Sequence, residues 1–258
     1  MKKISSILAT LPLITTACSG GGGGSPSSDN TTIDTNTNQS IDLSQQQGIW
    51  SSTETQTTTS ASGKQTTFQA PTGIVTSNQK MMILTGNSEL FVIEPNASIA
   101  HYFSSFAYNT DISATTELSN THFTFNYYNP KTDTNSEVAI PVDGHYDAAI
   151  DLNNLAGIWD DEYDTNNSWQ FTINTDGSFT ADKQSAGCTA TGNFSHIDTS
   201  KSELSVSITF NSQCGSLINT HSGLAWPDET HPNGKLNIAV YNGFELSSKA
   251  IGWKIIKQ

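Results

Sequence analysis

The sequence predicts an all-β protein built from two small antiparallel β-barrel-like domains that follow a disordered N-terminal tether. Three observations support this fold class. Short windows alternate apolar and polar residues, no window of 11 or more residues has helical spacing, and Thr, Ser and Asn crowd the chain. Short strands separated by Gly, Asn and Asp turns are typical of antiparallel barrels or sandwiches.

Alternation is clearest in the second half of the chain. Residues 169–173 alternate, Asp176-Gly177 provides a hairpin turn, and residues 178–181 leave on its other side. Residues 204–210 alternate without interruption, and residues 236–241 do so more loosely. The first half predicts further strands within residues 73–84, 89–93 and 123–127.

A repeated tripeptide divides the strand-rich region. Gly48-Ile49-Trp50 recurs as Gly157-Ile158-Trp159, each time after a polar lead-in that contains leucine. Each copy begins a segment of about 100 residues, a common domain size. We therefore expect related domains over residues 48–150 and 151–258, with Gly48, Trp50, Gly157 and Trp159 as the repeated core positions. If the repeat is a coincidence, one large ligand-binding barrel becomes the better interpretation.

The N-terminus has the layout of a secretory signal peptide. Lys2 and Lys3 precede an apolar run that ends just before Cys18. The run is too short to span the ~30 Å hydrocarbon core of a membrane as a helix. We assign residues 1–17 to the signal peptide. Residues 18–47, rich in Gly, Ser, Thr and Asn, form the expected flexible tether.

Small residues before Cys18 and a flexible segment after it resemble the lipobox of bacterial lipoproteins. The resemblance implies cleavage before Cys18 and acylation, such as palmitoylation, of that residue. Ser19, in place of the Asp that retains enterobacterial lipoproteins at the inner membrane, implies an outer-membrane anchor facing the periplasm or the cell surface. The alternative is an ordinary secreted protein with an incidental cysteine.

Cys188 and Cys214 remain once Cys18 is acylated. An even cysteine pair in an exported protein predicts a disulfide. The alternative, a metal or nucleophilic thiol site, lacks a closely spaced second cysteine.

The composition limits the classes of partner that this protein could bind. The formal net charge is −13 and the chain has no arginine. Nucleic acids and anionic headgroups require Lys or Arg clusters, so we expect no nucleic-acid partner and no electrostatic membrane docking. The acidic surface is better explained as a feature that keeps the protein soluble than as a binding site.

Two family resemblances concern the barrels. The Gly-x-Trp pattern resembles lipocalins and wider calycins, in which this Trp plugs one barrel end and an arginine packs over it. Here only Lys254 or Lys257 could replace that arginine. Residues 155–159, the 171–179 hairpin, Gly187-Cys188, Gly192 and Cys214 resemble META-type lipoprotein domains. Both resemblances imply a small barrel-like domain and specify no ligand.

The sequence offers few candidate sites. One loop gathers imidazole, aromatic and acidic groups and is a candidate contact surface, with a plain polar turn as the alternative: His221, Trp226, Asp228, Glu229 and His231. The acidic residues 160–164 lack the Asp/Asn alternation of a calcium loop, which favours a solvated strand end. No two of the six histidines have metal-ligand spacing. We expect no metal and no cofactor.

The leading hypothesis is a non-enzymatic binding module anchored in the outer membrane. Its partner would be a protein, as for an inhibitor or immunity-type protein, or an envelope component. The alternative is a lipocalin-like carrier, which needs an apolar cavity inside one barrel. A hydrolase ranks third, because the sequence shows no nucleophile–base pair.

Overall fold

The computed structural model describes residues 40–52, 54–59, 65–68, 70–86, 88–129, 134–143, 145–162, 169–183, 187–228 and 234–258. The signal peptide, Cys18 and most of the predicted tether lie outside these ranges. All described residues belong to one compact unit, Ile33–Gln258. Residues 40–47, which the sequence assigns to the tether, contribute to this unit. Leu43 is buried in its core and the Ile41 amide donates to the Ala97 carbonyl at 2.8 Å.

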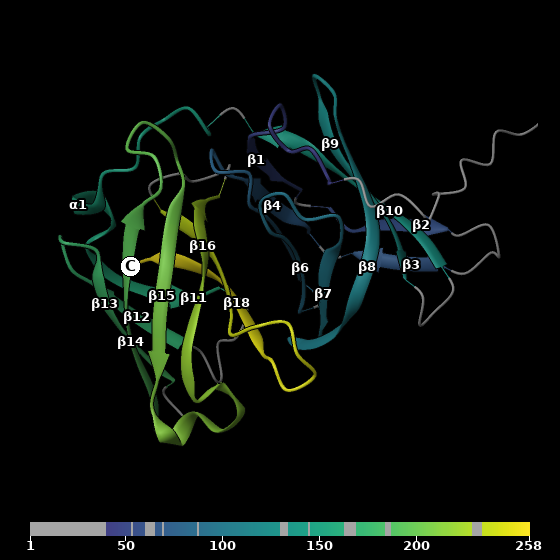
Figure 1. Cartoon of the computed structure of the whole chain (residues 1–258). Helices are drawn as coiled ribbons and strands as arrows, with labels where there is room; N and C mark the ends of the chain where they lie inside the picture. The colour runs from purple at the N-terminus through teal and green to yellow at the C-terminus, as the bar shows by residue number, and fades with distance from the viewer. Residues whose placement is uncertain are drawn as a thin grey trace, which may run out of the picture. The chain divides into compact units, whose positions relative to one another are not determined.

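The first half of the chain forms a closed antiparallel barrel (Figure 1, purple to teal). Each strand pairs with the next in the barrel, and the last closes on the first. Its strands are β1 (Gly48–Ser51), β4 (Thr72–Val75), β5 (Met81–Thr85), β6 (Glu89–Ile93), β7 (Ala100–Ser104), β8 (Ala107–Leu118), β9 (His122–Asn129) and β10 (Thr134–Asp143). Between β1 and β4, the chain forms a separate two-stranded sheet of β2 (Gln56–Thr59) and β3 (Gln65–Phe68).

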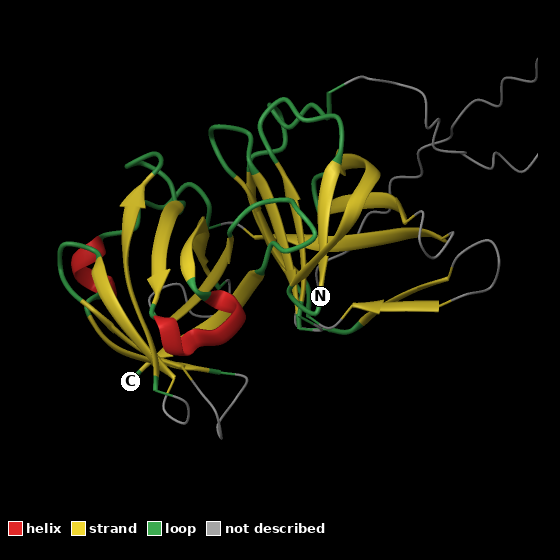
Figure 2. Cartoon of the chain, turned by 60° about the horizontal axis from the view of Figure 1, so that its bottom comes forward, coloured by secondary structure: helices red, strands yellow, loops and turns green. Residues whose placement is uncertain are grey.

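The second half forms another closed barrel with the same strand order (Figure 1, green to yellow). Its strands are β11 (Gly157–Asp161), β12 (Trp169–Ile173), β13 (Ser178–Lys183), β14 (Cys188–His196), β15 (Leu204–Phe210), β16 (Asn219–Pro227), β17 (Lys235–Tyr241) and β18 (Ala250–Lys257). Figure 2 shows two short helical segments, α1 (Leu152–Leu155) and the 3₁₀ helix η1 (Ser212–Leu217). The predicted all-β class with two antiparallel barrels is confirmed.

Aromatic rings fill the interior of each barrel. In the first barrel, Phe91 lies 5.3 Å from Phe125 and 5.0 Å from Tyr127, measured between ring centroids. In the second, Trp253 lies 5.7 Å from Trp169 and 5.4 Å from Phe171. Alternation along the strands points these rings inward. They occupy the space in which a lipocalin-like carrier would hold its ligand.

The two Gly-Ile-Trp segments begin β1 and β11, and Trp50 and Trp159 are both fully buried. The contacts around the two indoles differ. Trp159 Nε1 donates to the Leu155 carbonyl at 2.7 Å, and Lys257 Nζ lies 5.8 Å from the Trp159 ring centroid. Lys257 is one of the two lysines that the sequence offered as a replacement for the lipocalin arginine.

The predicted disulfide between Cys188 and Cys214 is confirmed. It joins the first residue of β14 to η1, across a sequence separation of 26 residues. The bond therefore fixes η1 at the end of the second barrel where β14 begins.

An apolar cluster joins the two barrels, which the sequence did not predict. Strands β5 and β17 are buried on both faces, because one face lines its own barrel and the other meets the neighbouring barrel. The cluster contains Ile49, Ile74, Met82, Leu84, Leu90, Val92, Phe103, Tyr146, Leu224, Trp226, Ala239, Tyr241 and Ala250. Each barrel keeps its own closed sheet, and this cluster packs the two barrels against each other.

Buried polar bonds reinforce this junction. Glu203 of the second barrel is fully buried, and its carboxylate accepts hydrogen bonds from the Ser77 amide at 2.8 Å and from Tyr146 Oη at 2.7 Å. A buried carboxylate is costly unless it is hydrogen bonded. The Ser77 bond exists only while the two barrels are packed together, so it favours that arrangement over separated barrels.

Candidate ligand pocket between the barrels

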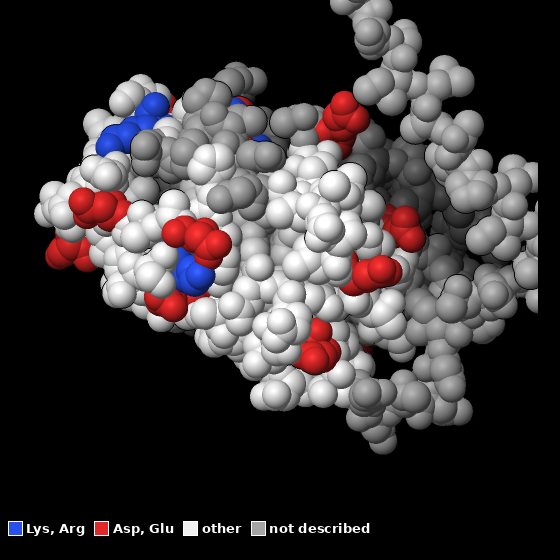
Figure 3. Space-filling view, turned by 90° about the horizontal axis from the view of Figure 1, so that it is seen from above, with Lys and Arg blue, Asp and Glu red and all other residues white. Residues whose placement is uncertain are grey.

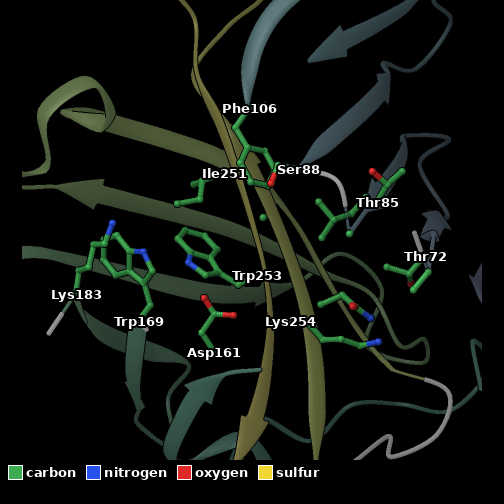
Figure 4. A pocket seen from close by; sticks show the side chains of 15 residues that line it. Thr72, Thr85, Ser88, Phe106, Asp161, Trp169, Lys183, Ile251, Trp253 and Lys254 are labelled. Carbon is green, nitrogen blue, oxygen red and sulfur yellow. The ribbon is translucent and has the colours of Figure 1, made fainter. Parts of the chain in front are cut away.

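A pocket of about 410 Å³ opens where the first barrel meets one end of the second. Its volume falls within the range of small-molecule sites. Figure 4 shows Trp169, Trp253 and Asp161 on one side and Thr72 and Thr85 on the other. The lining comprises Ala70, Thr72, Leu84, Thr85, Gly86, Ser88 and Phe106 from the first barrel, and Asp161, Trp169, Lys183, Asn237, Ile251, Gly252, Trp253 and Lys254 from the second.

The strand register places this pocket at the end of the second barrel where β11 ends and β12 begins. Asp161 is the last residue of β11, two residues beyond Trp159. Trp169, the first residue of β12, pairs with Lys183, the last residue of β13. Lys183 in turn pairs with Cys188, so the disulfide lies at the same end. The pocket therefore adjoins the end of the second barrel at which β12 begins and β13 ends.

Two residues of the pocket lining carry buried polar atoms without partners among the described residues. Asn237 is fully buried, yet among the described residues neither its Oδ1 nor its Nδ2 has a hydrogen-bond partner. Trp253 is 2% exposed, and its Nε1 also has no partner in the described ranges. Buried polar groups in native proteins are almost always hydrogen bonded. In the strand register Asn237 lies opposite Lys254, whereas Trp253 lies opposite Ile238. The Asn237 side chain therefore faces the first barrel, and the Trp253 indole faces the interior of the second.

The charged groups of the lining are balanced in sign. Lys254 Nζ forms an ion pair with Asp228 at 2.5 Å, and the side chains of both residues are largely buried. Lys183 and Asp161 contribute one charge of each sign near the two tryptophans (Figure 4). The pocket therefore has no strong preference for a charged ligand.

Gly252 forms part of the pocket wall and requires the absence of a side chain. A Cβ atom built at this position would lie 2.4 Å from Leu84 Cδ1 across the junction. Glycine at this position lets β18 approach the first barrel closely, so the pocket depends on how the two barrels pack.

A carboxylate network begins at the first-barrel side of the pocket. Thr85 Oγ1 donates to Glu89 at 3.3 Å, and Tyr102 Oη donates to the same carboxylate at 2.6 Å. Burial raises the pKa of Glu89, and these two hydrogen bonds partly oppose the rise. Ionised Glu89 is therefore less favourable here than in water.

The predicted contact loop is not an exposed loop. His221 and Trp226 lie in β16, and both are fully buried; Asp228 follows the strand and is 3% exposed. Trp226 Nε1 donates to Thr72 Oγ1 at 3.0 Å, which ties β16 to the pocket wall of the first barrel. Burial lowers the pKa of His221, partly offset by its hydrogen bond with the Asn219 carbonyl. Glu229 and His231 lie outside the described residues.

The acidic segment after Trp159 takes part in ordinary polar contacts. Asp160 accepts a hydrogen bond from the Gln170 side chain at 3.0 Å, and Glu162 forms an ion pair with Lys235 at 2.6 Å.

Within the described ranges, no group of three or more His, Cys, Asp or Glu side chains is placed to hold a metal ion. On the face seen in Figure 3, acidic side chains are spread among uncharged residues. In the described part of the chain, no helix has the length and apolar character needed to cross a membrane.

Sequence reasoning missed the residues that define the pocket. Asn237 offered a signal, because it interrupts a run of otherwise apolar residues in β17. In the sequence, Trp169 and Trp253 could be recognised only as core residues of predicted strands.

The chain matches no protein-family model, no curated protein and no solved structure.

Proposed function

We propose that this protein is a non-enzymatic binding module of the bacterial cell envelope that holds a small ligand in the pocket between its barrels. One observation carries the ligand site: Asn237 is fully buried at the pocket with both polar atoms of its side chain unpaired among the described residues. The lipobox resemblance at Cys18 and the Cys188–Cys214 disulfide support the envelope location.

The depth of these groups favours a small ligand over the folded protein partner that the sequence first suggested. Asn237 and Trp253 are nearly inaccessible from the surface. A folded partner presents a broad surface, whereas a small molecule can enter a pocket of this size. The same geometry modifies the carrier hypothesis, because the ligand would lie beside the second barrel's end and make polar contacts.

Native mass spectrometry of the full chain, purified from its host envelope in mild detergent, tests the ligand. We expect a small added mass on the wild-type protein and none on Ile251→Trp, since Ile251 lines the pocket and a larger side chain fills it. Thr191→Trp, on the exposed face of β14, is the control and should keep the added mass. The hypothesis fails if the wild type carries no added mass even after incubation with a small-molecule extract of the envelope.

The anchor has a separate test. Cys18→Ser should yield protein that takes up no labelled fatty acid and no longer fractionates with membranes, because the acylated thiol is gone. Unchanged labelling and fractionation would remove the lipoprotein assignment and leave the pocket unaffected.

A further inference from the structure

We propose that the mouth of the second barrel, where it opens into the inter-barrel pocket, binds the ammonium and carboxylate groups of a zwitterionic amino acid. This inference rests on the proposed function, because it names the ligand class of the same pocket. Four residues of the pocket lining define the mouth: Asp161, Trp169, Lys183 and Trp253.

The strand register places the two charged residues of the mouth on the inner side of the barrel. Residues directly opposite each other in a sheet share a face. Lys183 lies opposite Trp169, and Asp161 lies opposite Ile255; both partners belong to the core of the second barrel. Strand β12 lies between β11 and β13, so Asp161 and Lys183 flank Trp169 with their backbones about 10 Å apart. Figure 4 shows these side chains gathered on one side of the pocket.

Trp253 adds a buried donor to the same mouth. Its indole belongs to the core of the second barrel, and its ring centroid lies 5.7 Å from that of Trp169. Trp253 Nε1 has no hydrogen-bond partner in the described part of the chain. An indole N–H can only donate, so the ligand atom that meets it must be an acceptor. A carboxylate oxygen is an acceptor that the ammonium of Lys183 also attracts.

Asp161 and Trp169 favour a cation beside that carboxylate. A carboxylate binds an ammonium by charge-assisted hydrogen bonds, and the face of an indole attracts a cation. Lys254 does not add to this balance, because it lies opposite Asn237 on the face toward the first barrel and pairs with Asp228 at 2.5 Å. The mouth therefore presents one charge of each sign, and an amino acid carries the complementary pair.

Ligands with a single charge match only part of the mouth. A simple anion is repelled by Asp161, and a simple cation is repelled by Lys183 and leaves the Trp253 N–H unpaired. The apolar part of an amino acid can lie against Phe106 and Ile251, which line the same pocket. The site should therefore discriminate between an amino acid and analogues that lack either charged group.

Three probes of matched shape separate the possibilities: leucine, isocaproate, which lacks the ammonium, and isoamylamine, which lacks the carboxylate. They are titrated into the ¹⁵N-labelled full chain, whose five tryptophans give five indole N–H resonances. Trp253→Phe identifies the resonance of Trp253 by its absence. We expect leucine to shift this resonance and to bind at least about tenfold more tightly than either analogue.

Two charge-removing variants should change this selectivity in opposite ways. With Asp161→Asn, leucine should lose most of its advantage over isocaproate and keep its advantage over isoamylamine. With Lys183→Gln, the reverse is expected. Asp182→Asn makes the same chemical change as Asp161→Asn on the exposed face of β13, outside the pocket lining, and should keep both preferences.

Three outcomes overturn the inference. If either analogue binds the wild type as tightly as leucine, the zwitterion assignment fails while the small-ligand pocket stands. Selectivity that survives both Asp161→Asn and Lys183→Gln places the amino acid elsewhere. If no probe shifts the Trp253 resonance up to its solubility limit, the inference fails, and the added mass in native mass spectrometry decides separately whether another small ligand fills the pocket.

Discussion

Both barrels bury a tryptophan from the same tripeptide, but they hold it by different contacts. In the second barrel, Trp159 donates a hydrogen bond to the Leu155 carbonyl and Lys257 lies over its ring. In the first, Trp50 stacks on Phe123 with centroids 4.2 Å apart, and its Nε1 has no partner among the described residues. The tripeptide thus accompanies the same position in each barrel, while residues far along the chain determine how the indole is fixed.

The barrels also differ in how they are stabilised. The second has a disulfide at the end that adjoins the pocket. The first has a half-buried carboxylate, Glu89, that accepts hydrogen bonds from Thr85 and Tyr102. A disulfide lowers the conformational entropy of the unfolded chain. A desolvated carboxylate instead makes the free energy of unfolding depend on pH. Reduction of the disulfide and a change of pH should therefore alter the stability of the whole protein through different barrels.

Removing the disulfide should have the largest effect. Closing a loop with a separation of 26 residues contributes about 3–4 kcal/mol to the free energy of unfolding in the chain-entropy model. The Cys188→Ala/Cys214→Ala double variant should lose about that much in denaturant unfolding. Because the two barrels unfold as one body in this account, hydrogen exchange should show the loss in the slowest-exchanging amides of both barrels, in β8 and β9 as well as in β14 and β15. A loss confined to β14 and β15 would show that the second barrel unfolds on its own and would contradict the account.

Replacing Trp50 and Trp159 in turn with phenylalanine sharpens the comparison of the two tryptophans. Trp159→Phe leaves the Leu155 carbonyl without its indole donor, whereas Trp50→Phe removes an N–H that has no partner in the described residues. An unsatisfied buried group costs about 1–3 kcal/mol, so Trp159→Phe should be more destabilising by an amount of that order. Equal losses in the free energy of unfolding would show that the Trp159 hydrogen bond contributes no measurable stability beyond that of Trp50.

The smallest effect concerns pH and the first barrel. Because burial raises the pKa of Glu89 above its ordinary value of 4.5, the folded protein holds this proton more tightly than the unfolded chain. Its contribution to stability is present below pH 4.5 and is lost as pH rises through the raised pKa. Glu89→Gln should therefore be more stable than the wild type at pH 7 and lose that advantage near pH 4. A variant less stable than the wild type at pH 7 would contradict this account.

Strand periodicity sufficed to predict the barrels but not their junction. The alternation at residues 204–210 and the Asp176-Gly177 turn correspond to observed strands and a hairpin, because one face of each strand lines a barrel interior. Met82 and Leu84 point out of the first barrel, and only the neighbouring barrel explains their burial. A single sequence carries no record of which outward residues another domain covers.

The error at Trp226 has the same origin. The adjacent Pro227 and the acidic residues beyond it suggested a polar turn, but Pro227 ends strand β16 and the indole packs between the barrels. Asn237 could have been recognised as unusual, because it lies among apolar residues in a predicted strand. Its role at a pocket could not be predicted, since the opposite wall comes from the other barrel.

The central claim is that the two barrels form one cooperative body, since their shared core also builds the pocket. Scanning calorimetry of the intact chain tests this claim most directly. Because Trp226, Tyr146 and Glu203 make buried contacts across the junction, we expect a single transition whose calorimetric and van't Hoff enthalpies agree. Two resolved transitions, with proteolysis near residues 147–154 releasing two stable fragments, would show independent domains and contradict the account.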